Sequence, residues 1–329
     1  MDLDDYFISK REEYIMDSFK FQSGDVLNNV SVEYMTFGTP KYDDNGCINN
    51  AIVYCHGSLG NYASVSKLCP LSYAGGPFDK NELFIISLSE LGAPGSCSPS
   101  TTNLNNSFPK YSIEDMVNFQ NKFLKDKFGI THVRGIIGNS MGGFVALTCA
   151  VLYPDYADFI ISGVSGYKVA GRNYILSKLV DEIISTDGDY DSGKNTSSLV
   201  RTLRLATQAV YSFGISKEAL HKIPNSQLDV EFDEFGDEGL LDSIFDVKYC
   251  NDATLDYDIE KDLNKIRSKV LIIGINQDQY FPPNLDAIPM HNLIEDSELI
   301  IYDSDLGHIG FRELGTIEEE LSEFMKNFR

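Results

Sequence analysis

The serine at the centre of G-N-S-M-G, positions 138–142, is the residue of this chain best suited to chemistry. An apolar run ending at Ile137 precedes it, and a helical pattern containing Phe144 follows it. This order is typical of a nucleophile elbow, a sharp strand-to-helix turn that exposes the serine hydroxyl. The turn would also direct the backbone N–H of Met141 toward a developing oxyanion. We therefore predict that Ser140 is an enzyme nucleophile and not part of an ordinary glycine-rich turn.

Such a serine needs a histidine to accept its proton, and the chain has five histidines. With this kind of elbow the triad runs in the order serine, acid, histidine. His291 and His308 qualify, because the other three precede the serine or fall in a helical region. His308 lies in a glycine-flanked loop after the last predicted strand, where the active sites of open α/β sheets assemble. We assign the base to His308, since His291 lies in a helix-like stretch.

The acid should come from the end of the strand before that histidine. Asp278 closes an apolar run at 270–275 and is the predicted acid, although turn or helix-cap aspartates also occur at such places. Asp303 and Asp305 are weaker candidates because they lie too close to His308 in sequence.

A second oxyanion donor should follow an early strand. The segment H-G-S-L-G at 56–60 comes directly after the apolar run 51–55. Gly57 permits a close backbone approach, and we assign the donor to the N–H of Ser58, beside the N–H of Met141. Gly57 and Leu59 are predicted to contact substrate. His56 is interpreted as a residue that fixes this loop.

The formal net charge of −22 and the scattered cysteines exclude several classes of function. Nucleic-acid binding requires clustered Lys and Arg, and an anionic membrane surface would repel this chain. The six cysteines show no C-x-x-C spacing, so we expect neither a zinc site nor a disulfide framework. The first 20 residues contain no apolar signal core, and no segment has the length and apolarity of a membrane span. We expect a cytoplasmic protein without a metal or a bound cofactor.

Strands and helices alternate along most of the chain, as in a parallel, doubly wound sheet. A half-buried strand pair is predicted at 26–36, with further strands at 51–55, 83–88, 133–137, 159–162, 270–275 and 299–302. A helix should begin at a capping box of Ser112 with Asp115 and end at Gly129. A last helix should begin at a second capping box, Thr316 with Glu319.

The alternation stops between about residues 163 and 257, where helical stripes and an acidic patch at 229–242 replace it. We interpret the region as a helical insertion with a solvated acidic edge, which would overhang the elbow as a lid. The predicted organisation is a core over 1–163, a lid over 164–257 and the rest of the core over 258–329.

With these pieces placed, the chain resembles the homoserine O-acetyltransferase family of α/β-hydrolase enzymes. The likeness spans nearly the whole length. It is carried by C-H-G-S-L-G at 55–60, L-G-A-P-G-S-C-S-P-S at 91–100, F-P-K-Y-S-I-E-D at 108–115, G-I at 129–130, G-N-S-M-G-G at 138–143, Y-P-D at 153–155, D-Q-Y-F-P-P at 278–283 and G-H at 307–308. The resemblance implies an α/β-hydrolase fold with a helical lid inserted in the core, a serine acyl-enzyme and a homodimer.

One departure from that family concerns the substrate. Homoserine-acetylating members typically read G-H-D after the last strand, and the carboxylate could hold the amino group of the acceptor. Ile309 occupies that position here and cannot do so. This favours hydrolysis of a small ester, thioester or amide. The alternative is transfer of an acyl group from acyl-CoA, then a co-substrate, to homoserine or another small alcohol. A third and weaker alternative is a non-catalytic binding protein that keeps the fold.

Overall fold

The computed structural model describes residues 10–328, which contain an eight-stranded sheet in the order β1-β2-β4-β3-β5-β6-β7-β8. β1 (Glu12–Lys20) and β2 (Val26–Gly38) form an antiparallel hairpin, and β2 also runs antiparallel to β4 (Phe84–Leu88). All other pairs are parallel. These remaining strands are β3 (Ala51–Cys55), β5 (Val133–Asn139), β6 (Ala157–Gly163), β7 (Lys269–Ile275) and β8 (Ser297–Tyr302).

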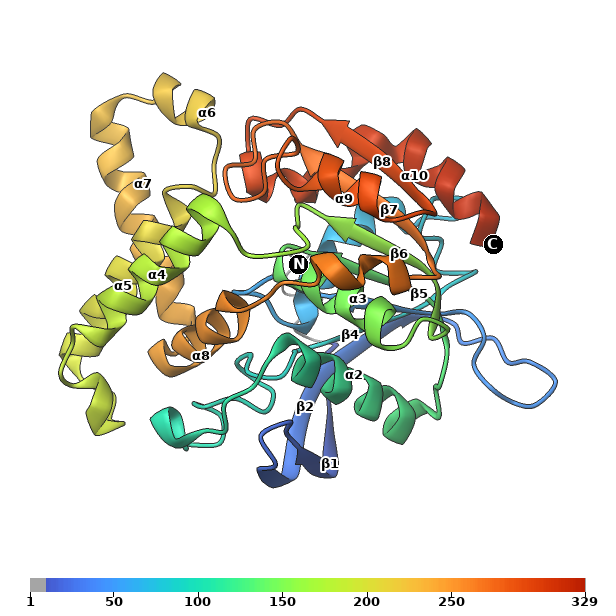
Figure 1. Ribbon diagram of the computed structural model, residues 1–329, viewed down its shortest axis with the longest axis horizontal. Coiled ribbons are helices and arrows are strands. Elements are labelled where there is room, and N and C mark those ends of the chain that lie inside the picture. Colours follow the sequence, from blue (N-terminus) through green and yellow to red (C-terminus); the bar gives the residue numbers. More distant parts are fainter. Residues whose placement is uncertain (1–9, 329) are drawn as a thin grey trace.

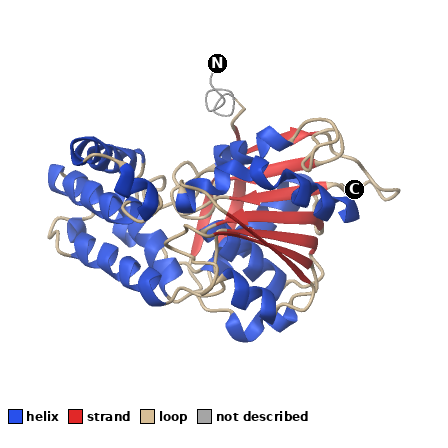
Figure 2. Ribbon diagram, turned by 90° about the horizontal axis from the view of Figure 1, so that it is seen from above, coloured by secondary structure: helices blue, strands red, loops and turns tan. Residues whose placement is uncertain are grey.

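Helices cover both faces of the sheet, as Figure 2 shows. Side chains alternate along each strand, so Val53 and Cys55 join one core cluster while Ile52 and Tyr54 join the other. The first cluster is completed by α2 (Ile113–Phe128), α3 (Met141–Leu152) and α9 (Ala287–Leu293). The second is completed by the 3-10 segments η1 (Tyr62–Leu71) and η6 (Gly307–Ile317) and by α10 (Glu318–Met325). The predicted doubly wound architecture is confirmed.

A group of helices inserted between β6 and β7 lies to one side of the sheet (Figure 1). These are α4 (Gly171–Ser185), α5 (Ser197–Tyr211), α6 (Lys217–Lys222), α7 (Asn225–Glu238) and α8 (Ile244–Leu255). Val180, Leu199 and Phe245 belong to a small hydrophobic cluster that the inserted helices form among themselves. The insertion therefore has a core of its own.

Register brings the carboxyl ends of the central strands to one edge. Cys55 pairs with Gly138, and Asn139 pairs with Gly163, which pairs in turn with Ile273. The loops that follow β3, β5, β6 and β7 therefore meet at the same edge, the place where open α/β sheets build their sites.

Two expectations about secondary structure were wrong. Residues 26–36 do not form a strand pair, because β2 is one strand whose partner is β1 in the charged segment before it. The second capping box does not form: Thr316 lies inside η6, and α10 begins without a side-chain cap. A capping residue needs extended backbone, which a continuous 3-10 segment does not offer. The first capping box is confirmed, with Gly129 left-handed at φ 69°.

No helix among residues 10–328 has the length and apolarity needed to cross a bilayer. The segment 1–20, for which the sequence predicts no apolar signal core, lies partly outside the described residues.

Candidate active site

Ser140 lies at a sharp turn between β5 and α3, with φ 55° and ψ −125°. A residue other than glycine is strained in this conformation. The turn needs its flanking glycines. A Cβ on Gly138 would lie 2.0 Å from the carbonyl oxygen of Gly142, and a Cβ on Gly142 would lie 2.1 Å from that of Cys55. The predicted elbow is thus present as a strained strand-to-helix turn.

Hydrogen bonds from neighbouring segments hold this strained turn. The Ser140 N–H donates to the Gly163 carbonyl at 3.0 Å, and the buried Ser165 hydroxyl donates to the Ser140 carbonyl at 2.9 Å. The Tyr54 hydroxyl donates to the Asn139 side chain at 2.6 Å. Strain is tolerated where the surrounding structure over-determines the backbone. Ser165 was not identified from the sequence, because its role depends on the loop after β6 folding back on the elbow.

Asp278 and His308 are brought together from different strand ends. Nδ1 of His308 lies 2.8 Å from Oδ2 of Asp278, whose side chain is fully buried. The other carboxylate oxygen accepts the backbone N–H groups of Tyr280 and Phe281 at 2.8 and 3.1 Å. The ring of His308 is also held edge-on by Tyr280, with centroids 4.7 Å apart.

The other candidates for the acid and the base form hydrogen bonds or ion pairs with residues outside the predicted triad. Asp303 accepts hydrogen bonds from the side chains of Asn276 and Gln277, and Asp305 pairs with Lys222. His291 lies on α9, where Nδ1 is 2.9 Å from the Ser297 hydroxyl.

The loop after β3 lies against the elbow. A Cβ on Gly57 would be 3.5 Å from the Cβ of Ser140, so the two segments are in close contact. Nε2 of His56 accepts the backbone N–H of Glu90 at 2.9 Å, and its Nδ1 lies 2.7 Å from the Gly57 carbonyl. Burial lowers the pKa of His56 to about 4, so the ring is neutral and Nδ1–H donates to Gly57. His56 therefore ties the loop after β3 to the backbone at Glu90.

Ser140 and His308 line one cavity of about 580 Å³, together with Gly57, Ser58, Leu59 and Met141. Asp278 lies behind His308 and does not line it. The structure therefore brings together every site residue predicted from the sequence. Among the described residues, no group of His, Cys, Asp and Glu side chains is arranged to hold a metal ion.

The cavity also carries charges that sequence reasoning missed. Glu231, Glu234 and Glu238 of α7 line it, opposed by Lys67 and Arg312. These glutamates belong to the acidic patch at 229–242, and Glu234 and Glu238 are exposed, so the patch is a solvated edge that also forms part of the cavity wall. Their spacing of three and four residues is the signal that could have placed them on one helical face.

Comparison with known proteins agrees with this architecture. Residues 50–313 match the family described as "alpha/beta hydrolase fold". A probable acyltransferase of Methanothermobacter thermautotrophicus is 43% identical over 310 residues, which cover 94% of this chain and 96% of the relative. A homoserine O-acetyltransferase of Haemophilus influenzae is 27% identical over 328 residues, covering 88% of this chain and 90% of the relative.

Solved structures share the fold. A homoserine O-acetyltransferase from Bacillus anthracis has a TM-score of 0.82 at 20% identity, covering 96% of this chain and 97% of that one. An acetylester hydrolase from Corynebacterium glutamicum has a TM-score of 0.81 at 21% identity, covering 96% of both chains. The family match spans most of the chain. This chain therefore belongs to the α/β-hydrolase fold family, as an enzyme of the homoserine O-acetyltransferase-like type.

Proposed function

We propose that the protein transfers acyl groups through a covalent intermediate on Ser140. His308 is the general base, Asp278 orients its ring, and the N–H groups of Met141 and Ser58 stabilise the oxyanion. The observation that carries this proposal is the hydrogen bond from the buried Asp278 to His308, which lines the same cavity as the strained Ser140. Gly57 and Leu59 would contact the bound acyl substrate.

The chemistry follows from these positions. Oγ of Ser140 attacks the acyl carbonyl carbon while Nε2 of His308 takes the hydroxyl proton. The tetrahedral anion collapses, the bond to the leaving group breaks, and the leaving group takes that proton from His308. An acceptor hydroxyl then attacks the acyl-enzyme, its proton passes to His308 and then to Oγ, and Ser140 is restored.

The acceptor decides between two classes of enzyme. We favour acyl transfer from acyl-CoA to homoserine or another small alcohol, because the 43% identical relative is a probable acyltransferase. The preference for hydrolysis that the sequence suggested is not supported by that relative. Hydrolysis of a small ester, thioester or amide is the second candidate, because Ile309 lines the cavity where the resemblance calls for a carboxylate.

An amino-acid acceptor would need another partner for its ammonium group. The glutamates of α7 offer carboxylates in the same cavity, and Arg312 offers a cation for a substrate carboxylate. Residues 164–257, which contribute this wall, would act as a lid between core segments 1–163 and 258–329.

We also propose an assembly and a location for the protein. We infer a homodimer that involves the insertion, because Ile175, Leu179 and Leu241 are 68, 47 and 84% exposed. We propose a reducing, cytoplasmic location, which the six cysteines favour because their spacing in the sequence does not suggest a disulfide framework.

The test is acetyl-CoA consumption with and without L-homoserine, using Ser140→Ala as the blank. Release of CoA that accelerates with homoserine supports transfer to that acceptor. Turnover of an aryl acetate that depends on Ser140, with no response to homoserine, supports hydrolysis. If the wild-type protein neither turns over these substrates nor reacts with a fluorophosphonate, the non-catalytic alternative replaces both.

A further inference from the structure

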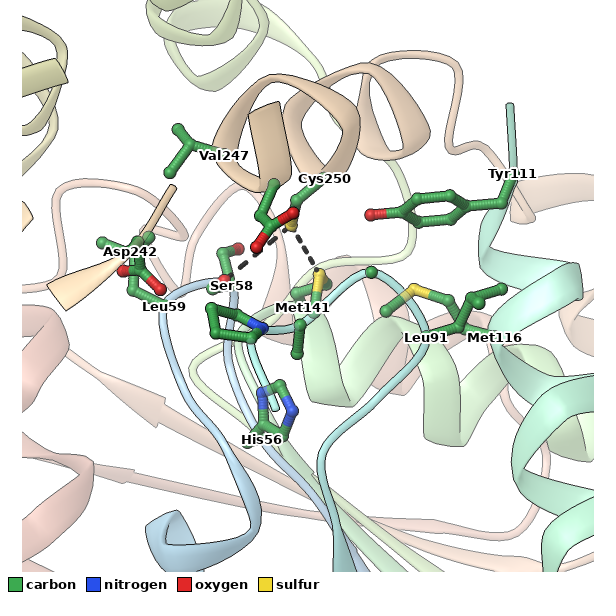
Figure 3. Close-up of a pocket in the computed structure, with 14 residues that line it drawn as sticks. His56, Ser58, Leu59, Leu91, Tyr111, Met116, Met141, Asp242, Val247 and Cys250 are labelled. Atoms are coloured by element: carbon green, nitrogen blue, oxygen red, sulfur yellow. Dashed lines mark hydrogen bonds between the residues drawn. The ribbon is translucent and has the colours of Figure 1, made fainter. Parts of the chain in front are cut away.

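Helix α8 of the insertion places one side chain against both residues that carry the proposed oxyanion donors. The Cys250 thiol donates a hydrogen bond to the Ser58 carbonyl at 3.8 Å, and its Sγ lies 3.3 Å from Sδ of Met141. Figure 3 shows both contacts as dashed lines converging on Cys250. Ser58 lies in the loop after β3 and Met141 is the first residue of α3, so a residue of the insertion bridges two separate segments of the core.

α8 is itself anchored to the core on the same side. Asp246 accepts the Ser100 backbone N–H at 2.8 Å and the Ser98 hydroxyl at 3.2 Å. The Tyr249 hydroxyl donates to the Phe108 carbonyl at 2.7 Å. These bonds lie within one turn of Cys250, so the thiol is presented from a fixed helix.

The thiol acts here as a donor and a packing surface. Burial raises the pKa of Cys250 to about 12, so the S–H group keeps its proton at neutral pH. A protonated thiol can donate weakly to a carbonyl and is a poor nucleophile.

A cavity beside the contact between Cys250 and Met141 leaves room for the Met141 side chain to shift. This small cavity of about 10 Å³, room for roughly one water, is lined by Cys250, Met141 and Tyr111. The Tyr111 hydroxyl is buried and has no hydrogen-bond partner among the described residues. A smaller side chain at position 250 would enlarge this cavity and release Met141 and Ser58 from one common support.

We propose that Cys250 is a positioning residue that sets the spacing of the Ser58 and Met141 N–H groups, so that the insertion holds the oxyanion hole in its working geometry. This inference rests on the proposed function. His56 contacts the Gly57 carbonyl of the same loop, and Cys250 contacts the Ser58 carbonyl from the opposite side of the loop (Figure 3). An oxyanion hole stabilises a transition state only when both donors meet the developing charge at hydrogen-bond distance.

Three variants test the proposal: Cys250→Ala, Cys250→Ser and, as a matched control, Cys149→Ala. Cys149 is buried as well, but it lies on α3 with its thiol 3.9 Å from the Asn121 amide. Cys250→Ala should lower kcat for an aryl acetate by about 10-fold with little change in KM, less than the roughly 100- to 1,000-fold cost of losing a whole donor. The rate of fluorophosphonate labelling should fall in parallel, because its phosphoryl oxygen uses the same hole.

Cys250→Ser should recover much of the loss, since its hydroxyl can donate to the Ser58 carbonyl. Cys149→Ala should keep kcat within about twofold even where its thermal unfolding temperature falls as far as that of Cys250→Ala, since buried truncations cost stability at either site. The pH profile of kcat/KM should keep its shape in all three, because Asp278 and His308 are untouched.

The proposal is overturned if Cys250→Ala keeps wild-type kcat, or if Cys149→Ala loses kcat to the same extent. It is also overturned if Cys250→Ala changes only KM. A wild-type protein inert toward both reagents would instead overturn the proposed function, so the two failures are distinguishable.

Discussion

Nδ1 of His308 lies 2.8 Å from Oδ2 of Asp278, although 30 residues separate them in the chain. Backbone N–H groups of Tyr280 and Phe281 occupy Oδ1, which leaves Oδ2 to the histidine. The hydrogen bond engages Nδ1 of His308, so Nε2 is the ring nitrogen available for the proton transfer that we propose. Asp278 and His308 are coupled by geometry that neither strand end could provide alone.

Replacing Asp278 by Asn should leave the fold intact and remove most of the activity. The amide can offer its N–H to Nδ1 and so favour the wrong tautomer of His308, which in serine proteases costs about 10,000-fold in kcat. Asp303→Asn is the matched control, because Asp303 bonds Asn276 and Gln277 at the end of the next strand and should lose less than about threefold. Steady-state hydrolysis of an aryl acetate measures kcat for both variants. Near-normal kcat in Asp278→Asn would remove Asp278 from the proposed mechanism.

The segment before His308 should be intolerant of a methyl group. Gly307 has φ 60°, and a Cβ there would lie 2.8 Å from the backbone nitrogen of Ser216 in the insertion. The N–H of His308 also donates to the Gly214 carbonyl at 2.9 Å, so the insertion and the histidine share this contact. Gly307→Ala should therefore lower kcat and destabilise the fold by about 1–3 kcal/mol.

Gly315→Ala provides the control for that change. Gly315 lies in the same 3-10 segment, and a Cβ there would meet nothing within 4 Å. Its kcat and its urea midpoint should stay near those of the wild type. Equal behaviour of the two variants would show that the contact with Ser216 does not constrain His308.

The three triad candidates could be predicted because each depends on local sequence and chain order. Ser140 has its glycines beside it, and Asp278 and His308 each follow an apolar strand run in the expected order. The same locality gave the capped helix that begins after Ser112. Their meeting at one sheet edge follows from parallel strands, whose carboxyl ends lie together.

What could not be predicted depends on contacts between distant segments. β1 carries exposed charges such as Glu12 and Glu13, and only its pairing with β2 makes it a strand. Glu234 lines the cavity because of the way α7 packs in the folded protein. The acidic run alone does not predict that packing. The contacts of Cys250 with Ser58 and Met141 exist only because α8 packs against the core, and no local pattern around position 250 predicts them.

Strain at the nucleophile should appear as a stability difference between two inactive variants. Ser140 has φ 55° and ψ −125°, a conformation open to glycine and costly for other residues. Ser140→Gly should unfold at higher urea than Ser140→Ala, by about 1–2 kcal/mol in the free energy of unfolding. The same pair at Ser177, inside α4, should show the opposite order, because glycine costs about 1 kcal/mol in a helix. Equal stability of the two variants at position 140 would mean that the turn is not strained.

The stability of the fold should depend on pH through a buried acid, Glu90, next to the loop at 56–60 that follows β3. Glu90 is fully buried, the Cys55 thiol offsets only part of the desolvation of its carboxyl group, and its backbone N–H donates to His56. Burial raises the pKa of Glu90 from 4.5 to about 8. The folded protein therefore keeps this proton at pH values where the unfolded chain releases it. The contribution is fully present below pH 4.5 and is lost as pH rises to about 8, at on the order of 1.4 kcal/mol per pH unit.

Glu90→Gln cannot ionise and should remove this dependence. Urea unfolding at pH 5.5 and pH 8.5 measures it: the free energy of unfolding of Glu90→Gln, relative to the wild type, should rise by a few kcal/mol between the two pH values. Glu319→Gln, an exposed carboxyl on α10, controls for the loss of one charge and should show no such rise. Because the backbone bond from position 90 to His56 survives the substitution, the oxyanion loop keeps its support and kcat should stay near that of the wild type at pH 7. A difference that stays constant with pH would mean that burial does not raise the pKa of Glu90 in the folded protein.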